Sequence, residues 1–122
     1  MISLQLKDDQ SEIVHYDFED YPIYIKKSLL SSYHHFKAPI HWHNDIEFIA
    51  VLKGRMDYYI NGDMLTLRQN EGLFINSRQL HYGFSKPKEE CEFLCILIHP
   101  LYFVKYIHLN KDVSFHCLKM KI

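Results

Sequence analysis

Short apolar or alternating runs follow one another along the chain, with turn residues between them. Residues 46–53 are apolar at both odd and even positions, which is typical of a strand buried between two sheets. Gly54 is expected to break this strand. Residues 55–60 then alternate between apolar and polar positions, which predicts a second strand with one buried face.

A hairpin is predicted at Asn61-Gly62, because both residues tolerate the positive φ of a tight two-residue turn. Residues 64–67 form the expected return strand. A polar turn over residues 68–72 separates it from the next predicted strand, residues 73–75. The centre of the chain therefore shows strand patterns with turn chemistry between them.

Further strands are predicted on both sides of this central region. Residues 81–85 and 92–98 look like a pair joined by a polar loop, and weaker extended patterns cover residues 12–18 and 21–25. Short strands at regular spacing are typical of a β-sandwich or a β-barrel. The sequence therefore predicts an all-β fold.

The pattern changes at Pro100, a residue well placed to begin a helix. Helical spacing then relates Leu101, Val104, Ile107 and His108. We therefore divide the chain into an amino-terminal arm (residues 1–20), a β-barrel (residues 21–99) and the start of a helical or linker segment (residues 100–122).

Composition and charge are those of one globular domain that does not grip nucleic acid by itself. Of the 122 residues, 48% are hydrophobic and 24% are charged, and the formal net charge is -1. A chain without a basic excess is a poor match for DNA or RNA. Three cysteines without metal-type pairing do not make a disulfide framework, and no stretch reads as a signal peptide or membrane span. A cytoplasmic protein that makes no membrane contact is expected.

Candidate chemistry is concentrated just before the first central strand. His41, His43 and Glu47 share parity, so in an extended chain their side chains point to the same face. His81 follows another apolar run and is the fourth candidate. Three imidazoles and one carboxylate are ligands suited to a divalent metal such as zinc, nickel or iron.

The spacing His-x-His-x-x-x-Glu, with Gly54 after it, resembles the first cupin motif, and His81 matches the histidine that ends the second. The order of the segments HWHNDIEFIAVLKGRMDYYINGDMLTL, GLFINSRQLHYG and CEFLCILIHPLYF also resembles the amino-terminal sensing domain of AraC-type transcription regulators, over roughly residues 20–105. The resemblance implies a cupin-like double-stranded β-helix, a jelly-roll barrel, followed by a short helical segment.

The resemblance further implies a sensor that binds a small-molecule effector, a sugar or an organic acid, inside the barrel and that forms homodimers. The expected binding residues are His41, His43, Glu47, His81 and Tyr58, the first four of which could hold a metal instead. DNA would be contacted only through helix-turn-helix motifs, which these 122 residues do not contain, so the chain is expected to carry the sensor alone.

Two alternatives stay open at this point: a stand-alone metal-dependent cupin enzyme, an isomerase or dioxygenase, and a pure dimerisation module with a collapsed barrel. The chain departs from the general cupin pattern at His35, Asn70, Asn76, Arg78 and Ser85. Catalytic cupins depend on that frame, so we expect a binding protein rather than an enzyme.

Overall fold

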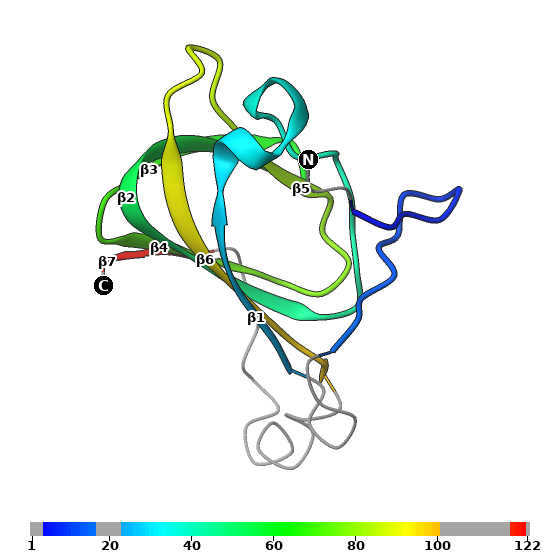
Figure 1. The fold of residues 1–122 in the computed structure, drawn as a ribbon. Helices are drawn as coiled ribbons and strands as arrows, with labels where there is room; N and C mark the ends of the chain where they lie inside the picture. Colours follow the sequence, from blue (N-terminus) through cyan, green and yellow to red (C-terminus); the bar gives the residue numbers. More distant parts are fainter. Residues whose placement is uncertain (1–3, 17–22, 101–117, 122) are drawn as a thin grey trace.

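The computed structural model describes residues 4–16, 23–100 and 118–121. These residues form seven strands and two single-turn 3-10 helices (Figure 1). In chain order the elements are β1 (Ile23–Leu29), η1 (Leu30–Ser32), η2 (His34–Phe36), β2 (Ile46–Ile60), β3 (Asp63–Arg68), β4 (Glu71–Ile75), β5 (His81–Phe84), β6 (Cys91–Ile98) and β7 (Leu118–Lys121). Within the described part of the chain, no helix is long and apolar enough to cross a membrane.

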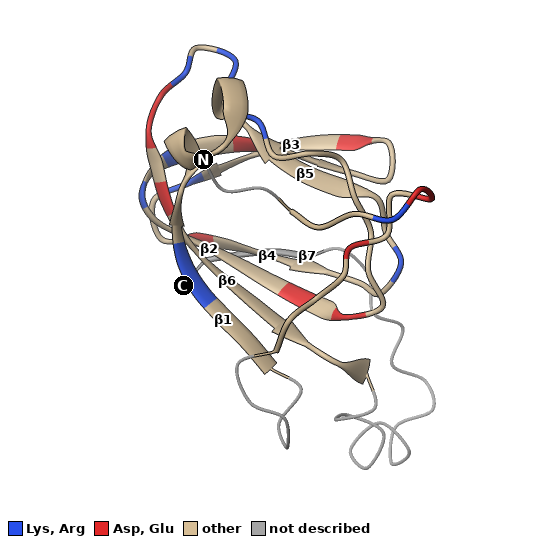
Figure 2. Ribbon diagram, turned by 45° about the vertical axis from the view of Figure 1, so that its right-hand side comes forward, with Lys and Arg blue, Asp and Glu red and all other residues tan. Residues whose placement is uncertain are grey.

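The strands form two facing layers that share β2. One layer has the order β1-β6-β2-β4-β7, and in the other β3 and β5 flank the second half of β2. All of these pairings are antiparallel. Figure 2 shows the two layers above one another, with chain segments crossing the open side between them. The all-β barrel expected from the sequence is confirmed.

Strand β2 runs through Gly54, where the sequence pattern predicted a break. Its first half pairs with β4 and β6, its second half pairs with β3 and β5, and the register with β6 shifts between Val51 and Lys53. Gly54 has a φ of 84°, and a Cβ at this position would overlap the carbonyl oxygen of Glu90. The glycine therefore bends one strand from the first layer into the second instead of ending it.

The core lies between the two layers. Burial in the second half of β2 alternates as predicted, with its apolar side chains inside and Arg55 outside. The core cluster comprises Leu30, Ile49, Val51, Met56, Tyr58, Ile60, Leu67, Leu73, Ile75, Cys91 and Phe93. Full burial of such side chains stabilises a fold by about 1.5–3 kcal/mol each, so this cluster is the main cohesive force between the layers.

The hairpin predicted at Asn61-Gly62 is confirmed. Both residues have positive φ, 48° and 99°, and the flanking pair is Ile60 with Asp63. Mirror-image turns of this kind match the right-handed twist of the strands that they join. Local turn chemistry thus sets the β2–β3 register.

Two sequence-based expectations about pairing and element type were wrong, and a third is tested only at residues 118–121. The strands near residues 81–85 and 92–98 exist, but each pairs with β2 in a different layer instead of with the other, because the loop between them crosses the barrel. Residues 13–16 are not in a strand, although the pattern over 12–18 suggested one. The predicted helix after Pro100 falls mainly on residues outside the described ranges, whereas residues 118–121 form β7 against β4.

The bend at Gly54 gives a stability prediction. Replacing Gly54 by Ala imposes left-handed backbone strain and a clash with backbone, so we expect a loss of about 3 kcal/mol in the free energy of unfolding, measured by urea titration. Gly62→Ala is the matched control, since its φ is also positive but nothing lies within 4 Å of the added Cβ. It should lose only about 1–2 kcal/mol. Equal losses would mean that the close approach to Glu90 is unimportant.

Candidate metal and ligand site

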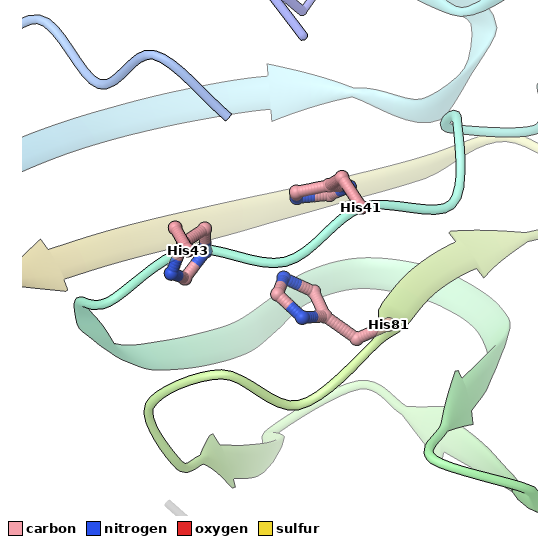
Figure 3. A group of neighbouring side chains, drawn as sticks. All are labelled: His41, His43 and His81. Carbon is pink, nitrogen blue, oxygen red and sulfur yellow. The ribbon is translucent and has the colours of Figure 1, made fainter. Parts of the chain in front are cut away.

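Three histidines from two distant segments meet at one end of the barrel. His41 and His43 precede β2, and His81 begins β5 (Figure 3). An isolated antiparallel bridge joins His41 to His81, with N–H···O distances of 3.2 and 2.9 Å, and the amide of Arg78 donates to the carbonyl of His43 at 2.8 Å. Backbone pairing therefore brings together side chains that lie forty residues apart in the sequence.

The three imidazoles form a compact, buried cluster. One ring nitrogen from each of His41, His43 and His81 lies within 4.8 Å of the others, and the residues are only 6%, 2% and 0% exposed. Figure 3 shows the rings facing a common space. The cluster predicted from the sequence is therefore assembled, away from bulk water.

Backbone carbonyls fix the tautomer of each ring. The Nδ1 atoms of His41, His43 and His81 lie 2.7, 3.1 and 2.7 Å from carbonyl oxygens of residues two positions away. A carbonyl only accepts, so Nδ1 carries the hydrogen and Nε2 of a neutral ring keeps its lone pair. The Nε2 atoms of His43 and His81 are buried without a hydrogen-bond partner. Buried polar atoms are seldom left in this state, which points to a ligand.

Glu47, from the start of β2, lies beside the histidines. Its carboxylate oxygens are 3.0 Å from Nε2 of His81 and 3.8 Å from Nε2 of His43. The contact between Nε2 of His81 and Glu47 is short enough for an ion pair. Its geometry does not meet that of a hydrogen bond, so Nε2 of His81 has no hydrogen-bond partner. The hydroxyl of Tyr58 donates to Glu47 at 3.4 Å, and the thiol of Cys95 does so at 3.1 Å.

These neighbours keep Glu47 ionised. Burial alone would raise the pKa of Glu47, but the charges of His81 and His43, whose Nε2 atoms lie close to its carboxylate, outweigh it and hold that pKa well below its usual range. Burial, together with the charge of Glu47, holds the pKa of the Cys95 thiol well above its usual range. The thiol therefore stays protonated and remains a donor.

The histidines themselves differ in their affinity for protons. Burial lowers the pKa of His41 to about 3, and the charge of His81 acts in the same direction, so His41 is neutral. Burial also opposes the protonation of His43, but the nearby negative charge of Glu47, with that of Glu12, raises its pKa above the ordinary value. A neutral imidazole is the form that binds a metal.

Glu12, in the amino-terminal arm, is a site residue that the sequence did not reveal. Its Oε2 atom lies 3.7 Å from Nε2 of His41 and 3.9 Å from Nε2 of His43. Burial raises the pKa of Glu12 to about 7. No motif marks this position, because it reaches the histidines only through a parallel bridge between Ser11 and Trp42.

A cavity of about 240 Å³ opens beside the cluster, between the two layers. It is smaller than the usual drug-sized pocket of about 300–1,000 Å³, so it suits a small molecule. Its polar lining includes Glu12, Tyr33, His41, Glu47, Tyr58 and Cys95. The structure thus places Tyr58, which the sequence suggested as a binding residue, in both the core cluster and the cavity wall.

These donors fit a divalent metal. The three Nε2 atoms of His41, His43 and His81 could hold an ion, and an ionised carboxylate, Glu47, lies next to them. The Nδ1–carbonyl hydrogen bonds supply the outer contacts that orient metal-binding imidazoles. Nitrogen and oxygen donors of this kind suit zinc, nickel and iron alike, so the site does not select among them.

The fold and the site together define a small antiparallel β-barrel with a buried histidine centre at one end. The cupin family, described as "Cupin domain", matches residues 33–97, more than half of the chain. The chain belongs to this family. Many cupins bind metals, which agrees with the donor set found here.

The sequence is also similar to a transcription regulator. It is 37% identical over 62 residues to the "Uncharacterized HTH-type transcriptional regulator YdeC" of Bacillus subtilis (strain 168). The alignment covers 51% of this chain and 21% of the relative, so it spans about a fifth of the relative's length.

Two solved structures show the same fold at low sequence identity. An RmlC-like cupin from Shewanella frigidimarina NCIMB 400 has a TM-score of 0.56 and 12% identity, over 64% of this chain and 67% of that chain. An oxalate decarboxylase has a TM-score of 0.52 and 13% identity, over 65% of this chain and 22% of that chain. At these identities the similarity concerns the fold and not the activity.

The first site prediction concerns metal binding. Replacing His43 by Ala removes one of three converging nitrogens, so affinity for Ni²⁺ or Zn²⁺, measured by isothermal titration calorimetry, should fall roughly a hundredfold or more. His34→Ala is the control, because this histidine is exposed and outside the cluster. Equal affinity in both variants would place the metal elsewhere.

The second site prediction concerns the pH dependence of stability without metal. The pKa of Glu47 is lower in the folded state, so Glu47 contributes to the free energy of unfolding above about pH 4.5. The pKa of His43 is higher in the folded state, so the contribution of His43 is complete below about pH 6.5 and is lost as the pH rises through its folded pKa. Glu47→Gln should therefore reduce the free energy of unfolding by about 3 kcal/mol at pH 6 and by less at pH 8.

Urea titration in EDTA at both pH values measures this difference. Glu89→Gln is the control, because its ion pair with Arg55 is exposed and should contribute less than about 1 kcal/mol at either pH. A loss for Glu47→Gln that does not change with pH would show that the buried pair is not ionised as described.

Proposed function

We propose that this cupin domain is the effector-sensing and dimerisation domain of an AraC-type transcription regulator that acts in the cytoplasm. In this proposal a small molecule binds in the barrel and controls DNA binding by helix-turn-helix motifs that lie outside these residues. The similarity to an HTH-type regulator supports the regulatory role. The domain itself binds and does not catalyse.

The observation that carries the proposal is the pair of buried Nε2 atoms of His43 and His81, which have no hydrogen-bond partner and lie beside an open cavity. Leaving such atoms without hydrogen bonds costs about 1–3 kcal/mol each, which a bound metal or ligand would offset. A bound divalent ion would supply a Lewis-acid site for an oxygen of the effector. A collapsed dimerisation module would have neither feature.

The amino-terminal arm is docked on the segment that carries the histidines. The indole nitrogen of Trp42 donates to the carbonyl of Asp9 at 2.9 Å, and its amide donates to that of Gln10 at 3.1 Å. The amide of Glu12 donates to the carbonyl of Trp42 at 2.7 Å. Trp42 thus holds the arm in place.

This docking gives the site a route to the rest of a regulator. Glu12 presents its carboxylate to His41 and His43, so an occupant of the centre changes the charge that this side chain meets. The arm then has different affinity for the barrel with and without the occupant, which is the requirement for a ligand-driven switch. In a dimer, the altered arm would change how the DNA-binding motifs are presented.

The same histidine centre also fits a second candidate, a metal-dependent isomerase or dioxygenase. The two candidates differ in what happens to the bound molecule. Recovery of the added compound unchanged after incubation with the metal-loaded chain supports the sensor, whereas its conversion supports the enzyme. A natural reading frame that encodes helix-turn-helix motifs after residue 122 would support the DNA-binding part of the proposal.

A thermal-shift screen tests the sensor directly. We expect at least one divalent metal, sugar or organic acid to raise the melting temperature, because a ligand at a hundred times its Kd stabilises the folded state by about 2.7 kcal/mol. For a domain of this size that corresponds to roughly 5–15 °C.

His81→Ala serves as the control, since it removes a converging nitrogen and should abolish the response. The absence of a response from any compound in the wild-type chain would contradict a sensing role. A response that persists in His81→Ala would place the binding site away from the histidine centre.

A further inference from the structure

One wall of the cavity is built by β1, and its inward side chains are Tyr24, Lys26 and Ser28. The antiparallel register pairs Lys26 with Cys95 on β6, and Cys95 in turn lies opposite Ile49 on β2. Paired residues present their side chains to the same face of a sheet, so Lys26, Cys95 and Ile49 all face the cavity. Lys26 is therefore part of the ligand-facing wall.

Lys26 differs from its neighbour Lys27 in having no acidic partner. Lys27 points outward and forms an exposed ion pair with Glu92 at 3.0 Å. For Lys26, no carboxylate oxygen among the described residues lies within the 4.0 Å of an ion pair. The positively charged stretch of β1, blue in Figure 2, thus contains two different lysines: Lys27 is paired with Glu92 on the surface, and Lys26 lines the cavity.

The charges around the cavity favour an anionic ligand. Glu12 and Glu47 both face the histidine centre, and their combined charge, at most two negative charges, does not exceed that of one divalent ion there. Lys26 then remains as an unbalanced positive charge in the cavity wall. A partly buried ammonium group without a counter-charge favours a ligand that carries a carboxylate.

The distance between the two ends fits a short molecule. Lys26 on β1 is in register with Ile49 on β2, two strands away, and Glu47 lies two residues from Ile49 along β2. At the usual strand spacings this places the Cα atoms of Lys26 and Glu47 roughly 12 Å from each other. Both residues line the cavity, whose volume of about 240 Å³ limits the ligand to a small molecule. Leu97 and Ile49 line the wall between them and suit a short carbon chain.

We propose that the effector is a small organic acid with two polar ends, one held at the histidine centre and the other, a carboxylate, bound by Lys26. This inference rests on the proposed sensing function and narrows its ligand from a sugar or an organic acid to an acid. Tyr24 and Ser28, on either side of Lys26, also line the cavity and contribute side chains with hydroxyl groups to this wall.

Isothermal titration calorimetry on the nickel-loaded chain tests this role with two matched probes. Malate and 2-hydroxybutyrate share a 2-hydroxy acid group and a four-carbon chain, and only malate has the second carboxylate. Malate should bind at least about tenfold more tightly, as a charge-assisted contact predicts. Lys26→Gln should remove that difference and leave the affinities for nickel and for 2-hydroxybutyrate unchanged.

Lys27→Gln is the control, since it removes a neighbouring positive charge outside the cavity and should change neither affinity. A preference for malate that survives in Lys26→Gln would overturn the role of Lys26. Binding of a neutral sugar such as D-xylose, with no binding of either acid, would overturn the acid class while leaving the sensing function standing. No binding of any of these compounds would count against the acid and the sensing function together.

Discussion

The structure depends on how a polar centre is kept inside an apolar barrel. Three imidazoles and a carboxylate are almost entirely removed from water, which is costly unless each group is paired. The fold satisfies the outer nitrogens with carbonyls of neighbouring residues and leaves two inner nitrogens without hydrogen bonds. The rigid outer contacts keep the inner ones directed at a common space. A barrel optimised for stability alone would have replaced this centre with apolar side chains.

Strand β2 makes this arrangement possible. Glu47 and Tyr58 are eleven residues apart, and a straight strand would separate them by about 36 Å. In the folded chain the Tyr58 hydroxyl lies 3.4 Å from the Glu47 carboxylate, because the strand bends at Gly54 and returns in the opposite layer. The bend therefore both joins the two layers and closes the polar site between them.

Charge and topology together favour a sensor over a packing module. The cavity has carboxylates at one end and a lysine in its wall, with apolar side chains between them. An amino-terminal segment, bound through Trp42, places Glu12 at the same centre. In the proposed sensor, occupancy of the centre would therefore alter the attachment of this segment, as regulation by a small molecule requires.

The sequence by itself determined the features that depend on neighbours along the chain. Alternation in residues 55–60 gave the buried face, Asn61-Gly62 gave the hairpin, and the parity of His41 and His43 gave two of the three histidines of the centre. These signals are local because side-chain direction and turn geometry follow from the backbone conformation of a few residues.

Only the tertiary structure decided which distant segments meet. It made β2 one continuous bent strand, assigned β5 and β6 to different layers, added β7 to the sheet and brought Glu12 to the histidines. Such pairings join residues far apart in the sequence, and they are selected by the burial of the whole core. No local pattern records that choice, because the same strand can satisfy its own periodicity against more than one partner.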